Sequence, residues 1–271
     1  MTHKILVLDI DGTLTNSKKE VTPATKAALT KLQKDGGIVA IASGRPTAGT
    51  AKIAEECDLA KYGGYIISYN GARIVRWDTK EVLYNNHLPQ QYIPQIFETA
   101  KERGVGMVTY DPDDNLITGT ATDKYMELEA RINSRIINQV KDFVGAIQFP
   151  VNKCLISGEP DVLAPLTEEL KERYYGVLNI YRSEPFFLEI MPPSVDKAHA
   201  LERLLPSIGI RREECICCGD GYNDITMLQY AGIGVAMANA QPEVKESADV
   251  ITLSNDEDGL VPIIEKYFLE E

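Results

Sequence analysis

The sequence has no long hydrophobic run. No apolar stretch in its 271 residues approaches the roughly 20 residues that a helix needs to cross a bilayer. The start of the chain also lacks the charged leader, apolar core and small-residue cleavage site that mark a secretory signal peptide. We therefore expect no association with a membrane and a cytoplasmic location.

Positive charge is scarce. The chain has 28 lysine and arginine residues against 40 aspartate and glutamate residues, which gives a formal net charge of −12. A protein that binds nucleic acid over a broad surface needs an excess of positive charge to meet the phosphate backbone. We therefore expect no nucleic acid partner.

Cysteine and histidine are also few. Five cysteines is an odd number without a disulfide-scaffold pattern, and the three histidines are scattered along the chain. Cys215, Cys217 and Cys218 form a cluster that could suggest zinc, but a zinc site needs further ligands at suitable spacing. The cluster lies where a buried strand is expected, and free cysteine packs as a small hydrophobic residue. We therefore interpret these cysteines as core residues.

The two ends of the chain alternate between strand-like and helix-like segments. Such alternation is typical of an open parallel sheet with helices on both faces, so the fold class we expect is α/β with a Rossmann-like core. The expected strands are 5–8, 38–42, 65–68, 215–218, 233–236 and 250–253, and the expected helices are 23–34, a segment after Pro46, 197–205, 223–231 and 260–269.

The middle of the chain has a different pattern. A hairpin signal at 110–115 separates two short apolar stretches, and longer amphipathic segments cover 92–103 and 163–175. The length allows about two domains at roughly 150 residues each. We therefore expect an α/β core made of residues 1–83 and 191–271, with an α+β domain inserted at 84–190.

Polar side chains follow four of the expected strands. In an open α/β sheet, ligands bind beyond the carboxyl ends of the strands, where such side chains gather. A lysine at the start of an expected helix adds a positive charge. The residues at these places are Asp9 and Asp11, Ser43, Gly44 and Arg45, Asn70 and Gly71, Asp220, Asn223 and Asp224, and Lys197.

These residue types suit phosphoryl chemistry at a magnesium ion. Carboxylates such as Asp9 and Asp220 are the hard oxygen ligands that Mg²⁺ prefers, and Lys197 can hold phosphoryl oxygens. A carboxylate beside a metal can attack phosphorus, and a second carboxylate two residues later can move protons. Taken alone, each motif has a plainer interpretation: aspartate is common in turns, Ser43 could cap a helix, and Lys197 could be a solvated charge. Their order and their placement at strand ends favour the catalytic interpretation.

The combination resembles the haloacid dehalogenase superfamily. The matching motifs are Asp9-Ile10-Asp11-Gly12-Thr13-Leu14, Ser43-Gly44-Arg45, Lys197 and Gly219-Asp220-Gly221-Tyr222-Asn223-Asp224. A large insert between the second and third motifs, with Tyr69-Asn70-Gly71-Ala72 and Phe187-Leu188-Glu189-Ile190, resembles the Cof-type sugar-phosphate phosphatases, which carry a C2 cap. The resemblance implies a Mg²⁺-dependent phosphatase of small phosphorylated metabolites, with an aspartyl-phosphate intermediate.

The resemblance also implies a role for each motif residue. Asp9 would be the nucleophile and a metal ligand, and Asp11 would be the acid and base, with its main-chain carbonyl as a ligand. Asp220 would complete the metal shell, and Asp224 would bind the metal directly or through water, or hold the neighbouring groups. Ser43 and Lys197 would hold the phosphoryl group, and the substrate contacts would include Gly44, Arg45, Asn70 and Asn223.

Two other functions remain open at this point. A phosphomutase or phosphotransferase could use the same motifs and pass the phosphoryl group to a sugar hydroxyl, although the placement of the large insert favours a phosphatase. A binding or regulatory protein could keep the fold without turnover, but such a protein has usually lost its nucleophile or acid, and both are present here. The sequence does not identify the physiological substrate or the oligomeric state.

Overall fold

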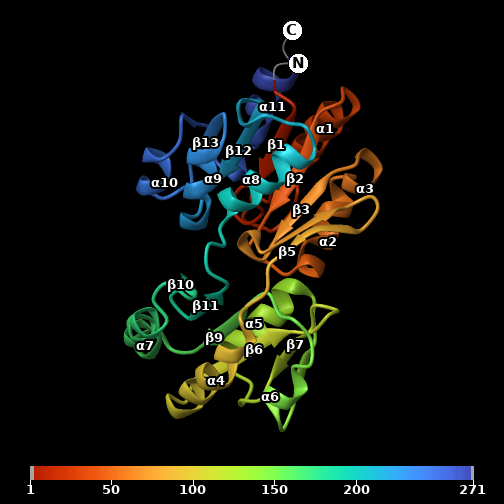
Figure 1. Ribbon diagram of the computed structural model, residues 1–271. Coiled ribbons are helices and arrows are strands. Elements are labelled where there is room, and N and C mark those ends of the chain that lie inside the picture. Colours follow the sequence, from red (N-terminus) through yellow and green to blue (C-terminus); the bar gives the residue numbers. More distant parts are fainter. Residues whose placement is uncertain (1–2, 270–271) are drawn as a thin grey trace. The chain divides into compact units, whose positions relative to one another are not determined.

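The computed structural model describes residues 3–269, which form two compact units (Figure 1). The first contains the chain up to residue 44, residues 50–84 and the chain from residue 196; the second contains residues 45–49 and 85–195. The second unit begins one residue later and ends five residues later than the expected insert, and it also includes the segment 45–49. That segment joins the second unit because the Ala48 amide donates to Asp114 Oδ2 at 2.7 Å and Gly49 lies against Asn133.

The first unit is built on an eight-stranded sheet in the order β14-β13-β12-β1-β2-β3-β4-β5. The strands from β14 to β3 are parallel, and β4 runs antiparallel to β3. The parallel α/β core expected from the sequence is therefore confirmed. The strands are β1 (Ile5–Leu8), β2 (Ile38–Ala42), β3 (Tyr65–Ser68), β4 (Arg73–Arg76), β5 (Glu81–Asn85), β12 (Cys215–Gly219), β13 (Ile233–Ala236) and β14 (Val250–Ile251).

Strand β1 lies inside this sheet and has apolar side chains on both faces. Leu6 and Leu8 belong to one hydrophobic core, whereas Ile5 and Val7 belong to the other. The continuous apolar run follows from this position, because each alternate side chain meets a different layer of helices. The run ends at Leu8, so the next residue, Asp9, is the first polar side chain beyond the strand.

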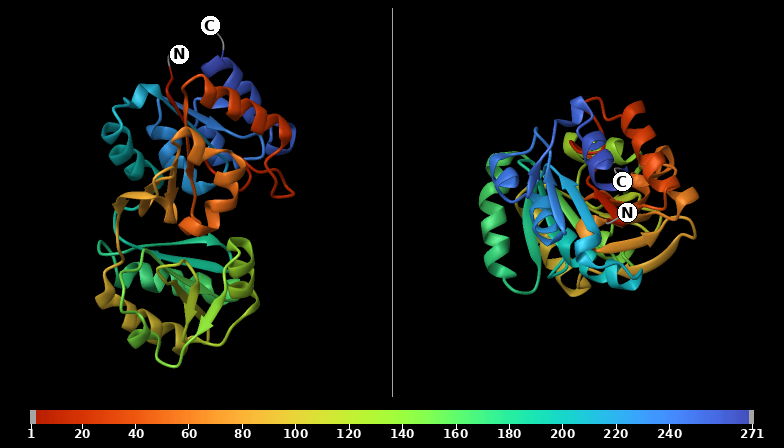
Figure 2. Two further views of the ribbon diagram at one scale, coloured as in Figure 1. Left: turned by 90° about the vertical axis from the view of Figure 1, so that its right-hand side faces the viewer. Right: turned by 90° about the horizontal axis from the view of Figure 1, so that it is seen from above.

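Helices cover both faces of this sheet (Figures 1 and 2). Residues of α1, α2 and α11 pack in the core on one face, and residues of α8, α9 and α10 pack in the core on the other. Local signals set two of the helix starts: Thr22 and Asp196 each cap the helix that follows, with the side chain accepting a backbone N–H. The helices are α1 (Pro23–Lys34), α2 (Thr47–Glu56), α3 (Leu59–Tyr62), α8 (Lys197–Ser207), α9 (Ile225–Tyr230), α10 (Pro242–Glu246) and α11 (Leu260–Ile264).

Three expected elements have a different start, length or helix type in the structure. The helix expected over 223–231 begins as a 3₁₀ turn at Tyr222–Asp224, because the Asp224 carboxylate bonds the backbone of the preceding loop. The strand expected over 250–253 is only two residues long. The closing helix continues past α11 as a π-helical turn, Glu265–Leu269.

The second unit has a six-stranded sheet in the order β10-β11-β9-β6-β7-β8. Its pairs are antiparallel except for β7 with β8. Helices α4 and α7 contribute apolar side chains to its core, together with α6 and the strands of the sheet. The elements are β6 (Gly106–Tyr110), β7 (Leu116–Thr118), β8 (Ile137–Gln139), β9 (Cys154–Ser157), β10 (Asn179–Glu184), β11 (Phe187–Met191), α4 (Ile93–Glu102), α5 (Lys124–Asn133), α6 (Phe143–Ala146) and α7 (Pro160–Arg173).

Two local predictions for hairpin and cysteine residues are confirmed. The turn between β6 and β7 is closed by Asp111, whose Oδ1 accepts the backbone N–H groups of Asp113 and Asn115 at 2.9 and 2.8 Å. Cys215, Cys217 and Cys218 lie in β12 and are fully buried, where they pack as core residues.

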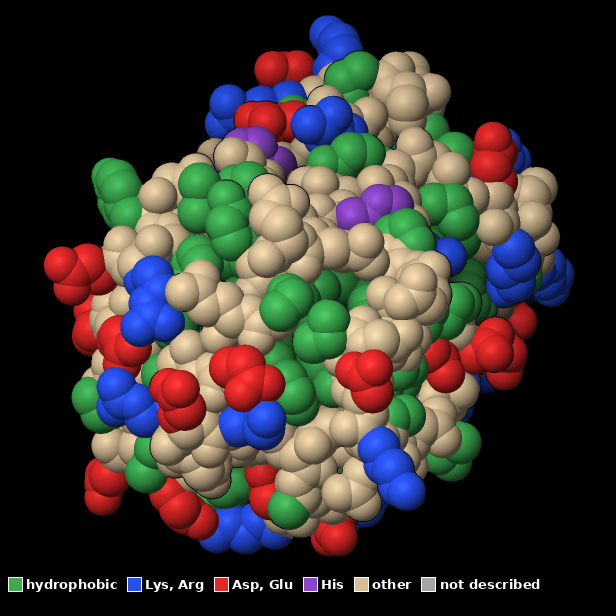
Figure 3. Space-filling view, turned by 60° about the horizontal axis from the view of Figure 1, so that its bottom comes forward, with side chains coloured by type: hydrophobic (Ala, Val, Ile, Leu, Met, Phe, Trp, Pro, Cys, Tyr) green, Lys and Arg blue, Asp and Glu red, His purple; other side chains and the backbone are tan. Residues whose placement is uncertain are grey.

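The charged residues of the face drawn in Figure 3 are mixed in sign, with lysine and arginine side chains scattered among aspartate and glutamate. Within the described part of the chain, none of the helices combines the length and the apolar character needed to span a membrane.

Candidate active site

A buried ion-pair network forms beyond the end of β1. Lys197, the first residue of α8, is completely buried, and Asp9 is only 7% exposed. Lys197 Nζ lies 2.6 Å from Asp9 Oδ1 and 2.5 Å from Asp224 Oδ1. One lysine therefore holds two carboxylates that are far apart in the sequence.

The network places more negative charge than positive charge in a buried space. Burial raises the pKa of Asp9 to about 8, and although Lys197 opposes this rise, Asp224 adds to it. Burial disfavours the charge on Lys197, but Asp224 and Asp9 outweigh it and raise the pKa of the ammonium group. The lysine therefore stays charged, while the carboxylates still lack a full complement of positive charge.

Asp224 organises the loop that follows β12. Its Oδ2 accepts the backbone N–H groups of Asp220 and Gly221 at 3.0 and 2.9 Å, and its Oδ1 accepts Lys197. The side chain is fully buried. Its contacts fix the backbone of the Gly219–Asp224 motif, so the carboxylate of Asp220 is presented from a rigid turn.

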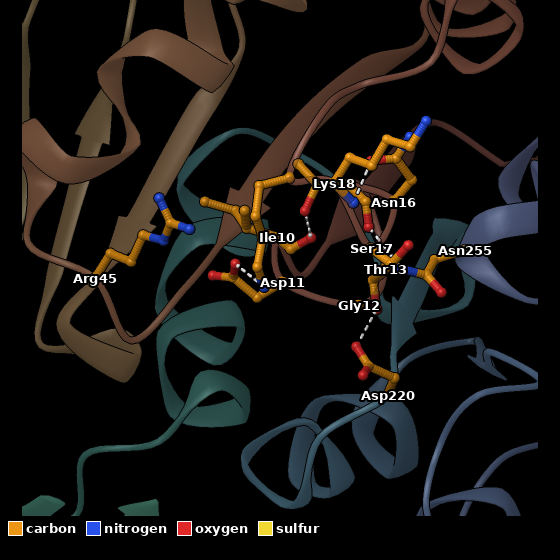
Figure 4. A network of polar contacts seen from close by, with 12 residues as sticks. Ile10, Asp11, Gly12, Thr13, Asn16, Ser17, Lys18, Arg45, Asp220 and Asn255 are labelled. Atoms are coloured by element: carbon orange, nitrogen blue, oxygen red, sulfur yellow. Dashed lines mark hydrogen bonds and ion pairs between the residues drawn. The ribbon is translucent and has the colours of Figure 1, made fainter. Parts of the chain in front are cut away.

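Asp220 lies over the loop that follows β1. Thr13 Oγ1 donates to Asp220 Oδ1 at 2.7 Å, a contact visible in Figure 4. Gly12 has a φ of +90°, and a Cβ at this position would lie 2.2 Å from Asp220 Oδ2. Glycine is thus required here both for the backbone conformation and for the close approach of the carboxylate.

Three carboxylates can share one cation at this site. Ligand oxygens of Asp9, Asp220 and Asp224 all lie within 4.8 Å of one another. Burial raises the pKa of Asp220 to about 6, even though the bond from Thr13 opposes the rise. Clustered carboxylate oxygens, together with the surplus of negative charge, fit a hard divalent cation such as Mg²⁺.

The carboxylate of Asp11 points to different surroundings. Its Oδ1 lies 2.9 Å from Lys19 Nζ, and its side chain is 37% exposed. Figure 4 shows this side chain turned away from Asp220. Among the described residues, the carboxylates that cluster as possible cation ligands are those of Asp9, Asp220 and Asp224, and the Asp11 carboxylate lies beside Lys19 instead.

The ends of β2 and β3 bring three more predicted residues together. Ser43 is 3% exposed, and its main-chain carbonyl accepts the main-chain N–H of Asn70 at 2.9 Å. Asn70 is buried with a φ of 50°, and its Oδ1 accepts Asn223 Nδ2 at 3.1 Å. Gly44 lies against Asn70, because a Cβ on Gly44 would be 3.1 Å from Asn70 Nδ2.

Arg45 belongs to the segment that groups with the second unit. Its Nη1 donates to the carbonyl of Gly49 at 3.4 Å. This contact lies within the second unit.

Sequence analysis missed three residues whose hydrogen bonds connect Asp220 with the loop that follows β1, directly or through one another. They are Asn239 and Asn255, which follow β13 and β14, and Thr13, which lies inside the first motif. The usable signal was their position: Asn239 and Asn255 follow the carboxyl ends of the two expected strands for which we named no site residue.

Known proteins share this arrangement over almost the whole chain. Residues 6–264 match the family described as haloacid dehalogenase-like hydrolase. The chain belongs to this family. The superfamily resemblance and the α/β fold class inferred from the sequence are thereby confirmed.

Individual relatives give the same result. A haloacid dehalogenase-like hydrolase from Bacteroides thetaiotaomicron is 46% identical, with a TM-score of 0.93 over 98% of this chain and 100% of its own. The Bacillus subtilis protein YxeH is 32% identical over 98% of this chain and 99% of its own. The subclass IIB sugar phosphatase BT4131 is 26% identical, with a TM-score of 0.84 over 98% of this chain and 100% of its own. Family and relatives together indicate that the protein is a phosphatase.

Proposed function

We propose that this haloacid dehalogenase-like phosphatase is Mg²⁺-dependent and hydrolyses sugar phosphates through an aspartyl-phosphate intermediate on Asp9. The observation that carries the proposal is the buried Asp9 carboxylate, held 2.6 Å from Lys197 and within reach of two further carboxylates. The likeness to a sugar phosphatase over nearly the full chain supports the substrate class.

The proposed reaction has two steps. In the first, an Asp9 oxygen attacks phosphorus, the bond from phosphorus to the leaving oxygen breaks, and Asp11 gives that oxygen its proton. In the second, Asp11 takes a proton from water, the resulting hydroxide attacks the phosphoryl group, and phosphate leaves the regenerated Asp9. Both carboxylates therefore return to their starting state.

The other site residues would bind and orient the phosphoryl group. Lys197 supplies a fixed positive charge beside Asp9, and it needs no rearrangement as charge develops on the phosphoryl oxygens. Ser43 and Asn70 would contact those oxygens, with Gly44, Arg45 and Asn223 as further substrate contacts. These assignments rest on the motif resemblance together with the burial of Ser43 and Asn70.

The carboxylate cluster would hold the cation. Asp9, Asp220 and Asp224 are the proposed side-chain ligands, and Asp11 is proposed to contribute its carbonyl. A bound Mg²⁺ would neutralise the charge that accumulates during phosphoryl transfer. The affinity should favour Mg²⁺ over Zn²⁺, because the clustered ligands are carboxylate oxygens without a histidine or cysteine among them.

The second unit is proposed to act as the cap that selects the substrate. The proposal rests on its place as an insert between the second and third motifs and on its own sheet and core. The physiological partner would then be a small phosphorylated metabolite. The cytoplasmic location stays a prediction from the sequence.

The test is phosphate release from a panel of sugar phosphates and p-nitrophenyl phosphate. We expect activity with Mg²⁺, loss of activity in EDTA and recovery when Mg²⁺ is added back. Asp9→Asn should lower kcat/KM by at least about 1,000-fold, or about 4 kcal/mol of barrier, because an amide is a poor nucleophile.

The control for this substitution is Asp35→Asn. Asp35 is an exposed residue between α1 and β2, at the opposite end of the sheet from the motif residues, and this variant should keep wild-type activity. Residual turnover of Asp9→Asn within tenfold of wild type, or full activity in exhaustively chelated protein, would contradict the proposal.

A further inference from the structure

Asn239 joins the two loops that carry the proposed nucleophile and metal ligand. It follows β13, and its Nδ2 donates to the carbonyl of Gly12 at 2.8 Å and to Asp220 Oδ2 at 3.3 Å. The Gly12 carbonyl is three residues from Asp9 in the chain. A single amide group therefore fixes the distance between the turn after β1 and the carboxylate after β12.

Both oxygens of Asp220 are held by this arrangement. Thr13 Oγ1 donates to Oδ1 and Asn239 Nδ2 donates to Oδ2. A carboxylate with one donor on each oxygen cannot rotate freely, and each oxygen keeps lone pairs for a further ligand. The plane of the Asp220 carboxylate is consequently set by Thr13, which lies in the first motif, and by Asn239, which lies outside the motifs.

A second asparagine holds Asn239 in turn. The main-chain N–H of Asn255 donates to Asn239 Oδ1 at 3.0 Å, so Asn239 presents its side-chain NH₂ group toward Asp220. Asn255 Nδ2 donates to the carbonyl of Thr15 at 2.9 Å, and Asp256 Oδ1 accepts the Ser17 amide at 2.8 Å. Figure 4 shows Asn255 beside this part of the loop.

The sheet order explains why these residues meet. Strands β14, β13, β12 and β1 are neighbours in that order, and all four are parallel. Their carboxyl ends therefore lie side by side, and each contributes one member: Asn255, Asn239, Asp220 and the Gly12–Thr15 turn. The hydrogen bonds run from Asp220 through Asn239 and Asn255 to the carbonyl of Thr15, and the backbone from Thr15 to Thr13 leads back to Asp220.

We propose that Asn239 is a positioning residue, which orients the Asp220 carboxylate for the divalent cation by tying it to the Gly12 carbonyl. The inference rests on the proposed function, because it assumes that Asp220 binds Mg²⁺. Residues that hydrogen-bond a metal ligand fix its orientation, and their loss typically weakens metal binding 10- to 100-fold. Asn239 acts on the cation site through Asp220 and has no contact with the reacting atoms.

The experiment measures Mg²⁺ binding to the full-length protein by calorimetry, without substrate. Asn239→Ala should weaken Mg²⁺ binding by about 10- to 100-fold. Asn239→Leu, which keeps the side-chain volume but has no donor, should do the same. In activity assays, the Mg²⁺ concentration for half-maximal rate should rise by the same factor, while KM for the phosphate ester at saturating Mg²⁺ stays within about twofold.

Two control variants separate this role from a purely structural one. Gln139→Ala removes an exposed amide that donates to the Thr120 carbonyl at 3.0 Å in the second unit, and Mg²⁺ binding should not change. Asn255→Ala removes the bond to Thr15 but keeps the backbone donor to Asn239. It should therefore lower the urea midpoint of unfolding while Mg²⁺ affinity changes little.

The outcomes are distinguishable. Mg²⁺ affinity within twofold of wild type in both Asn239 variants would overturn the inference, and so would a lower urea midpoint in EDTA with unchanged Mg²⁺ affinity. Circular dichroism would verify that each variant is folded. If the wild-type protein neither bound Mg²⁺ nor released phosphate, the proposed function would fail first, and the assignment of Asn239 would fail with it.

Discussion

Asp9 and Asp11 are two residues apart, yet their carboxylates lie in opposite surroundings. Asp9 is buried against Lys197, whereas Asp11 is partly exposed and lies beside Lys19. Strand β1 ends at Leu8 and the chain turns at Gly12, where φ is +90°. The side chains of Asp9 and Asp11 therefore do not follow the alternation of faces that holds within the strand. This difference suits the two proposed roles, because a nucleophile needs a fixed position and a proton carrier needs access to the leaving group and to water.

The first prediction separates these roles by leaving group. Asp11→Asn should slow hydrolysis of a sugar phosphate by about 100-fold or more and hydrolysis of p-nitrophenyl phosphate by less than about tenfold. The physical reason is that a sugar alkoxide is a strong base that needs a proton to depart, whereas p-nitrophenolate needs little help. Steady-state rates on both substrates at saturating Mg²⁺ measure the effect.

Lys19→Gln is the matched variant for this prediction. It removes the charge beside the Asp11 carboxylate without touching the carboxylate itself, and the side chain of Lys19 is 63% exposed. Its effect on both substrates should be small, since exposed ion pairs contribute little. Equal losses on the two substrates in Asp11→Asn would show that Asp11 serves the fold or the cation instead of proton transfer.

Local sequence patterns were sufficient for part of the site. Asp9, Ser43 and Asp220 each follow an apolar run, and a buried strand followed by a polar residue is visible within a few positions. Asn239 and Asn255 follow strands as well, but asparagine is common in turns for its own conformational reasons. Their role depends on which strands are neighbours, and strand order is set by contacts between segments far apart in the chain.

At the scale of elements, long periodic segments were predictable and short irregular ones were not. The bounds of β1, α1, β2 and β3 agree with those expected from apolar spacing and caps. The start of the segment after Gly221 differs because the Asp224 carboxylate accepts the backbone N–H groups of the residues four and three positions before it. Hydrophobic periodicity does not reveal this competition with the helix. The order of strands in the second unit was likewise outside what the sequence pattern could fix.

The second unit contains a buried ion pair whose removal should be costly. Lys153, just before β9, lies 3.0 Å from the Glu189 carboxylate on β11, with side chains 3% and 7% exposed. Ser183 Oγ also donates to Glu189 Oε1 at 2.9 Å. Burial disfavours the charge on Lys153, but the attraction of Glu189 and Glu129 together outweighs it and raises the pKa of the ammonium group. The two charges are therefore retained together inside the unit.

The second prediction concerns this pair. Glu189→Gln should destabilise the second unit by about 3–5 kcal/mol, because it removes the carboxylate that pairs with a buried lysine. Lys153→Met combined with Glu189→Gln should recover most of the loss. Native-state hydrogen exchange of peptides from β6, β9 and β11 measures the opening free energy of this unit.

The exposed pair on α7 provides the comparison for Glu189. Lys171 Nζ lies 3.3 Å from Glu168 Oε1, and both side chains are largely exposed. Glu168→Gln should cost no more than about 1 kcal/mol. A Glu189→Gln loss as small as that of Glu168→Gln, or a double variant no more stable than the single one, would show that the buried pair is not energetically coupled.

For the whole molecule, the division of the chain into two cores has a functional consequence. The motif residues Asp9, Ser43, Asn70, Lys197, Asp220 and Asp224 all belong to the first unit, which has its own sheet and two apolar cores. The second unit buries a separate cluster built from α4, α7 and its own sheet. Chemistry and substrate selection could therefore reside on separately folded parts of one chain.

The last prediction tests that separation. Replacing residues 85–195 with a short linker should leave a folded first unit that still hydrolyses p-nitrophenyl phosphate within about tenfold of the intact protein. Sugar phosphates should lose about 100-fold or more in kcat/KM, because contacts with the remote part of a substrate contribute to kcat as well as to KM. An activated aryl phosphate needs fewer such contacts, so it should lose less.

The measurement needs one control for the linker itself. Residues 45–49 group with the second unit, so their loss of contacts could disturb α2 even if the chemistry were intact. Asp114→Ala in the full-length protein removes the carboxylate that binds the Ala48 amide and reports that disturbance alone. If the truncated protein is folded by circular dichroism and ranks the sugar phosphates in the same order and with the same spread as the intact protein, specificity is set by the first unit, and the proposed role of residues 85–195 is wrong.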